Sequence, residues 1–126
     1  MYEQIERWLN DILKDGIPEG IVAFNFNLYE DFHSDRDTSW SMELIGTDSF
    51  DEDDEDWACD EVCDFGTREN PFSWIENAEW STILEKMVQL LNRYITNGLY
   101  ADVLKQYEGI GVGFVDGNIE ILYTKQ

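Results

Sequence analysis

The most constraining feature of this chain is a dense acidic segment from Asp48 to Asp64, DSFDEDDEDWACDEVCD, which holds ten carboxylates and no Lys or Arg. Six carboxylates are consecutive, from position 51 to position 56. Because like charges repel, this run cannot lie in a core and is poor material for a regular helix or strand. The residues that follow it, 57–65, alternate in character and indicate a structured, half-buried segment. A fold that holds such a cluster against its own repulsion is expected to use it on a partner.

Composition places the chain among packed globular proteins. Its 126 residues are 43% apolar and 14% aromatic, which predicts one domain over residues 1–126 with a substantial core. The 28 acidic residues outweigh 8 basic ones and set the net charge at −20. This charge repels nucleic acids and anionic membranes and attracts cationic proteins. We therefore expect a basic protein partner, and neither nucleic acid nor membrane.

The start of the chain and its cysteines suggest a compartment. The chain begins MYEQIERW, without an apolar signal segment, and no apolar run approaches the length of a membrane span, so we expect a cytoplasmic protein. Cys59 and Cys63 on one strand would have Cα atoms about 13 Å apart, whereas a disulfide tolerates about 7 Å. We predict two free, buried thiols. With His33 as the single histidine, no zinc site can form, and no cofactor is expected.

Hydrophobic periodicity predicts an α+β fold. The expected elements are a helix (5–13, capped by Gly16), three strands (21–29, 40–45 and 57–65), two helices (77–97 and 99–107) and a hairpin (110–114 and 119–123). The order α-β-β-β-α-α-β-β favours a mainly antiparallel sheet with helices packed on one face. A helix over 57–64 is the alternative to the third strand.

The expected core follows one stripe of the long helix: Trp80, Ile83, Leu84, Met87, Leu91, Tyr94 and Ile95. The shorter helix contributes Leu99, Val103, Leu104 and Tyr107. The uncovered sheet face would be an open polar platform of Asn25, Asn27, Ser41, Glu43, Asp60 and Asp64. Gly111 and Gly113 indicate either a close approach of another segment or a strand bend. Phe72 and Trp74 fit either packing at the sheet edge or an exposed aromatic anchor.

No catalytic or metal-binding motif appears. A calcium loop starting at Asp51 would have Asp56 where Gly is required and Val62 where Glu is required, so the EF-hand pattern fails. The carboxylates are too numerous and too solvated to single out an acid–base pair. A cysteine nucleophile would depend on His33, which we place in a solvated loop. We expect a protein that is not an enzyme and has no dedicated metal site.

The segment DEDDEDWACDEV and the closing hairpin VGFVDGNIEILY, together with the size and the order of elements, resemble small acidic α+β immunity proteins of bacterial toxin systems. In such systems a cytosolic antidote binds and blocks its cognate toxin. The resemblance implies a basic, nuclease-type toxin as the partner. It carries over no individual functional residue.

We therefore expect an acidic binding protein that neutralises a basic toxin. The predicted partner-binding residues are Asp51, Glu52, Asp53, Asp54, Glu55, Asp56, Trp57, Asp60, Glu61 and Asp64. One alternative is an acidic interaction or adaptor domain, or a nucleic-acid mimic, for another cationic protein. A further alternative is a binder of a small molecule or of divalent ions.

Overall fold

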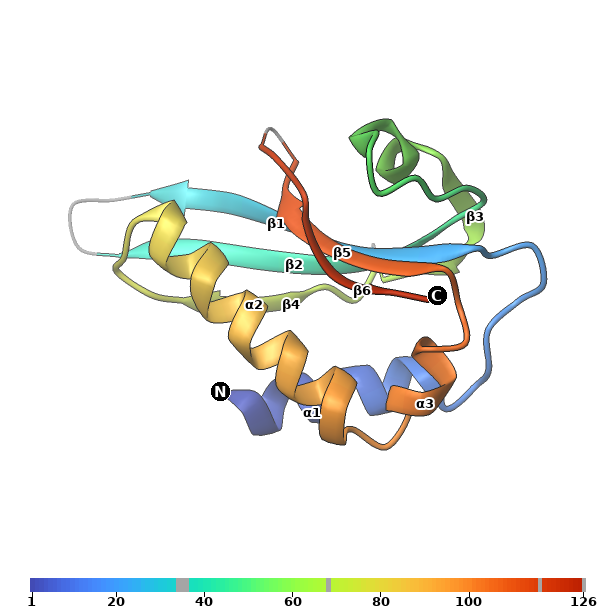
Figure 1. Ribbon diagram of the computed structural model, residues 1–126. Helices are drawn as coiled ribbons and strands as arrows, with labels where there is room; N and C mark the ends of the chain where they lie inside the picture. The colour runs from blue at the N-terminus through green and yellow to red at the C-terminus, as the bar shows by residue number, and fades with distance from the viewer. Residues whose placement is uncertain (34–36, 68, 116, 126) are drawn as a thin grey trace.

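The computed structural model describes the whole chain except residues 34–36, 68, 116 and 126 and the side chains of residues 33, 63 and 64. The elements, drawn in Figure 1, are α1 (Tyr2–Leu13), β1 (Ala23–His33), β2 (Thr38–Thr47), the 3₁₀ helix η1 (Glu55–Cys59), β3 (Glu61–Gly66), β4 (Phe72–Ile75), α2 (Trp80–Asn97), α3 (Ala101–Leu104), β5 (Gly109–Phe114) and β6 (Glu120–Thr124).

The strands form one six-stranded sheet in the order β3-β2-β1-β5-β6, with β4 also paired to β2. Four of the pairings are antiparallel, and β1 runs parallel to β5. The α+β fold with a mainly antiparallel sheet is thus confirmed. Strand β4 was not expected from the sequence, because a period of two over the four residues of FSWI is too short to stand out. His33 was expected in a loop over 30–39, but it ends β1 and pairs with Thr38 of β2, so both strands extend into that range.

The helices cover one face of the sheet (Figure 1). Their apolar sides meet Phe24, Phe26 and Leu28 of β1, which are buried as the period-two pattern requires. Along α2 the buried side chains recur every three or four residues, at Ile83, Met87, Leu91, Tyr94 and Ile95. This stripe confirms most of the expected core.

Polar contacts tie α1 to the elements around it. The Tyr94 hydroxyl donates to Asn10 Oδ1 (2.7 Å), and the Trp8 indole N–H donates to the Asn70 carbonyl (2.8 Å). The guanidinium of Arg93 lies 4.0 Å from the centre of the Tyr2 ring. The polar end of a buried phenol or indole usually finds a hydrogen-bond partner, as Tyr94 and Trp8 do, and these contacts orient the two long helices.

Five expected core residues are not fully buried, and two of them, Val103 and Tyr107, are half-buried. Trp80 is 59% exposed and Leu99 is 72% exposed, while Leu84 is only half-buried. Trp80 occupies the first turn of α2, where no other helix covers it. Leu99 precedes α3, which is limited to four residues and does not extend the apolar face back to it.

Leucine truncation along α2 should follow this burial. Leu91→Ala should cost about 2–5 kcal/mol, the usual range for a fully buried leucine. Leu84→Ala should cost less, since part of its surface is already in water. Urea unfolding of both variants gives the comparison. Equal losses would show that the half-buried position is packed as tightly as the core.

Tyr94→Phe should change how stability depends on pH. Burial raises the pKa of Tyr94 to about 12, so the fold favours the neutral phenol. That stability is present below the unfolded pKa and is lost as pH rises from about 10 toward about 12. The variant loses the hydrogen bonds of the hydroxyl to Asn10 and from the Tyr100 N–H, each worth about 1 kcal/mol near neutral pH. As the solution becomes alkaline, the stability of the variant should fall less than that of the wild type. Urea unfolding near neutral pH and near pH ~11 tests this; a difference that does not change with pH would contradict it.

Candidate functional site

Residues 48–60, here called the acidic segment, fold onto the side of the sheet opposite the helices (Figure 1). The segment leaves the end of β2, turns through 51–54, forms η1 and returns to the sheet as β3. Its position is surprising for a run of like charges, and it depends on the two aromatic residues within it.

Phe50 and Trp57 anchor the acidic segment to β5. Their ring centres are 4.9 Å apart with an edge-to-face geometry, and Trp57 is only 3% exposed. A Cβ on Gly109 would overlap the Phe50 ring, and one on Gly111 would lie 3.2 Å from the Trp57 ring. Glycine at these two positions therefore makes room for both rings. This confirms a close approach at Gly111, where β5 also shows the register irregularity of a strand bend.

Hydrogen bonds within the segment satisfy part of its backbone. The Asp54 carboxylate accepts from the Asp56 N–H (3.1 Å) at the N-terminus of η1, and Asp51 Oδ1 accepts from the Asp53 N–H (2.9 Å). Carboxylates are favourable at this end of a helix, because they face its unpaired N–H groups. Part of the acidic run thus caps its own short helix.

Further hydrogen bonds fix the two ends of the segment. The Asp48 N–H donates to the Asp60 carbonyl (3.1 Å), and the Ser49 hydroxyl donates to Asp60 Oδ2 (2.7 Å). The Ile119 N–H, just before β6, donates to Glu55 Oε2 (3.3 Å). The segment is therefore closed at its base and linked to the β5–β6 hairpin.

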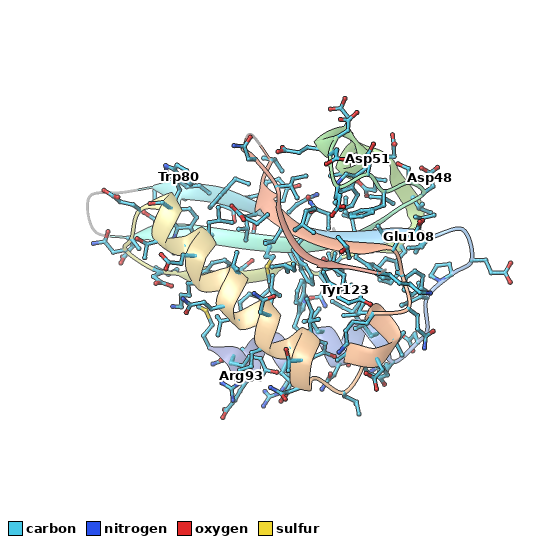
Figure 2. All side chains as sticks on the ribbon, in the orientation of Figure 1. Asp48, Asp51, Trp80, Arg93, Glu108 and Tyr123 are labelled. Carbon is cyan, nitrogen blue, oxygen red and sulfur yellow. The ribbon has the colours of Figure 1, made fainter. Side chains whose placement is uncertain are left out.

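The carboxylates themselves face solvent. All six side chains from 51 to 56 are exposed, as is Asp60, and Glu61 is half-buried. Figure 2 shows Asp51 on the outer side of the segment, away from the sheet. The basic residues lie elsewhere: five of the eight are in helices or at helix C-termini, namely Arg7, Lys14, Lys86, Arg93 and Lys105. The acidic segment therefore combines a high density of exposed carboxylates with the absence of any Lys or Arg in its sequence.

The predicted binding residues divide into three groups. The exposed carboxylates at 51–56 and Asp60 share one surface, with Glu61 beside it. Trp57 is buried beneath that surface, so its role is to hold the segment rather than to contact a partner. The side chain of Asp64 lies outside the described residues.

The predicted strand over 57–65 is wrong in its first half. Residues 55–59 form η1, and the strand begins at Glu61. The Cys59 side chain is consequently exposed rather than buried, and that of Cys63 is not described. The helical alternative fits only 57–59. Trp57 would point inward in a strand and does so in η1, so an apolar residue at this position does not distinguish a strand from a helix.

The polar face of the sheet is less open than expected. Asn25 and Ser41 are 2% and 7% exposed, and the half-buried Glu43 accepts a hydrogen bond from the Tyr29 hydroxyl (2.9 Å). The acidic segment and the hairpin cover part of this face. The platform available to a partner is therefore the outer surface of the acidic segment.

Phe50 and Gly109 were missed as structural residues of the site. Phe50 is the single apolar residue among the first nine of the segment, and it could have been recognised as an anchor for that reason. Gly109, Gly111 and Gly113 occur at alternate positions, which leaves one face of β5 without side chains. Trp74 is half-buried against the core, and Phe72 contacts both Trp74 and Trp8, which supports packing at the sheet edge.

Within the described part of the chain, His, Cys, Asp and Glu side chains do not converge in threes as metal ligands would. Among the same residues, no helix has both the length and the apolar character needed to cross a bilayer.

Comparison with protein-family models, curated proteins and solved structures finds no match to this chain.

Trp57→Ala should release the acidic segment. Removing a buried Trp costs about 3–5 kcal/mol, and protease cleavage after the acidic residues of 48–60 should become faster. Trp80→Ala is the matched control, because it removes an exposed indole. Unfolding curves and timed digestion with a Glu/Asp-specific protease test this. Similar stability and digestion for the two variants would contradict the anchoring role.

Proposed function

We propose that this chain is a non-enzymatic binding protein that neutralises a basic, nuclease-type bacterial toxin in the cytoplasm. The observation that carries the proposal is the acidic segment: six consecutive exposed carboxylates on a backbone anchored by two aromatic rings. The resemblance to bacterial immunity proteins supplies the class of partner. The surface for binding comprises residues 51–56 with Asp60 and Glu61, and Asp64 is assigned to it from the sequence.

Electrostatics and anchoring support binding in different ways. A concentrated negative surface accelerates encounter with a cationic protein, and the acceleration falls as salt is added. A segment that is already ordered loses less conformational entropy when a partner binds. An unanchored acidic tail of the same charge would gain only the first of these advantages.

The alternative of an acidic adaptor or nucleic-acid mimic uses the same surface on a different cationic protein. Partner identity therefore separates the two functions. The immobilised protein should capture a basic protein from a lysate of the native host at low salt and release it at high salt. Co-expression of that protein should arrest growth, and this chain should relieve the arrest. Capture of a harmless cationic protein would favour the alternative.

Comparing the loss of three charges in the acidic segment with the loss of three charges elsewhere should reveal whether the segment acts as a local binding surface. Glu52→Gln, Asp53→Asn and Asp56→Asn remove three exposed charges whose side chains make no recorded hydrogen bond among the described residues. Asp54 and Glu55 stay unchanged, because each accepts a backbone hydrogen bond. The matched control is Asp15→Asn, Glu19→Gln and Glu85→Gln, which removes the same net charge from exposed sites elsewhere.

The segment variant should fold with equal or greater stability, since self-repulsion falls, but associate with the captured protein more slowly and with a shallower salt dependence. The control should keep most of the association rate. Surface plasmon resonance at several salt concentrations gives both quantities. Equal effects of the two triple variants would mean that only net charge matters and would contradict a local binding surface.

A further inference from the structure

A second surface feature is a cleft of about 850 Å³ at one end of the sheet, and no residue of the acidic segment lines it. Three elements form its walls: the distal part of β1, the first turns of α2 and the β5–β6 hairpin. The lining residues are Leu28, Tyr29, Glu30, Asp31, Trp80, Leu84, Phe114, Val115, Gly117, Asn118 and Glu120. This cleft has no part in the anchoring of the acidic segment.

A row of aromatic rings leads from the core to this cleft. The fully buried Trp40 packs against Phe114 with ring centres 5.8 Å apart, and Phe114 packs edge-to-face against Trp80 at 6.1 Å. Trp80 is nevertheless 59% exposed, and Val115 beside it is 53% exposed. Phe114 therefore holds the Trp80 indole in place while leaving much of it open to solvent (Figure 2, where Trp80 is labelled at the start of α2). Exposed large apolar groups gathered in one concave site are typical of binding surfaces.

The charges around the cleft have one sign. Every charged side chain among the described lining residues is a carboxylate: Glu30, Asp31 and Glu120. The pairing of β1 with β2 shifts between Glu30 and Phe32, so Asp31 is the extra residue of a β-bulge. Bulges re-aim side chains and are frequent beside functional sites. Here the bulge lies in the wall of the cleft.

An aromatic floor with a carboxylate rim is suited to a cationic side chain. A guanidinium or ammonium group within about 6 Å of an indole is attracted by the ring's electron-rich face. Its alkyl stem packs on apolar surface while the charged end reaches the rim. A second copy of this chain is a poor occupant, because each copy carries a net charge of −20.

We propose that this cleft receives an Arg or Lys side chain from a basic segment of the protein partner. The cleft adjoins the acidic segment through the hairpin: Gly117, Asn118 and Glu120 line the cleft, and the Ile119 N–H between them donates to Glu55. The inference rests on the proposed function for the identity of the partner. It assigns steering to the acidic segment and the aromatic anchor contact to Trp80, in keeping with the dominance of aromatic and Arg contacts at interfaces.

The direct test uses the wild-type protein and two small molecules of similar shape. In a ¹H–¹⁵N spectrum the Trp80 indole signal is the one lost in Trp80→Ala. It should shift on titration with n-butylguanidinium and stay nearly still with the neutral n-butylurea. If neither compound shifts the Trp80 indole signal, the proposal is overturned. Equal shifts with both compounds would mean an apolar site without preference for cations and would also overturn it. A shift caused by raising the protein concentration alone would mean self-association and would also overturn it.

A hexa-arginine peptide tests the same site with a chain-like probe. Trp80→Ala should weaken its binding about three- to tenfold, and the pair Asp31→Asn with Glu120→Gln should weaken it as well. Leu99→Ala, at the opposite end of α2, is the matched control for loss of an exposed apolar side chain and should leave affinity unchanged. Equal affinities for Trp80→Ala and Leu99→Ala would contradict the proposal.

The two proposals fail separately. If the Trp80 signal responds to n-butylguanidinium but the acidic-segment variant keeps its salt-dependent association, the cleft is a cation site and the proposed role of the acidic segment is wrong. If the acidic-segment variant loses its salt-dependent association and n-butylguanidinium does not shift the Trp80 signal, the proposed role of the acidic segment is supported and the cleft proposal is overturned.

Discussion

The packing of two aromatic rings against a side-chain-free face of β5 is the contact on which the acidic surface depends. Phe50 and Trp57 lie over Gly109 and Gly111, where any Cβ would collide with a ring or displace it. Burial of the rings offsets the mutual repulsion of the exposed carboxylates around them, which water and salt already weaken. The sheet is thereby covered on both faces: by amphipathic helices on one, and in part by a strongly charged segment on the other.

The acidic segment differs from the helical layer in having no basic side chain to balance its carboxylates. Most of the basic side chains belong to the helical layer, where Lys86 pairs with Glu76 (2.8 Å) and Arg93 stacks on Tyr2. The acidic segment carries none. Beyond the hairpin, the cleft adds an exposed indole to the same negative surroundings. A cationic protein that contacts both features across the β5–β6 hairpin would meet long-range attraction first and an aromatic contact at close range.

Helices and strands could be predicted from the sequence where a hydrophobic pattern repeats over many residues. The stripe from Ile83 to Ile95 and the alternation from Phe24 to Leu28 predict α2 and β1, because each repeats over many residues and one side is buried. Shorter elements were harder to predict. β4 spans four residues, and η1 places Trp57 inward just as a strand would, so local patterns could not identify either one.

Some features of the candidate site could likewise be predicted from the sequence, and others could not. Exposure of the carboxylates at 51–56 follows from charge density alone and is found in the structure. The exposure of Trp80 and Cys59 depends on tertiary context: nothing in a helical stripe reveals that its first turn lies beyond the covering helices. The cleft depends on residues brought together from three distant segments, Leu28–Asp31, Trp80–Leu84 and Phe114–Glu120, which no local pattern relates.

Hydrogen exchange of the protein with and without its captured basic partner tests the central claim most directly. We predict slower exchange of backbone amides in residues 48–60 and in the β5–β6 hairpin, with the amides of α1 and the C-terminal half of α2 unchanged. Protection confined to the helical side, with the acidic segment exchanging as fast as in the free protein, would contradict the account.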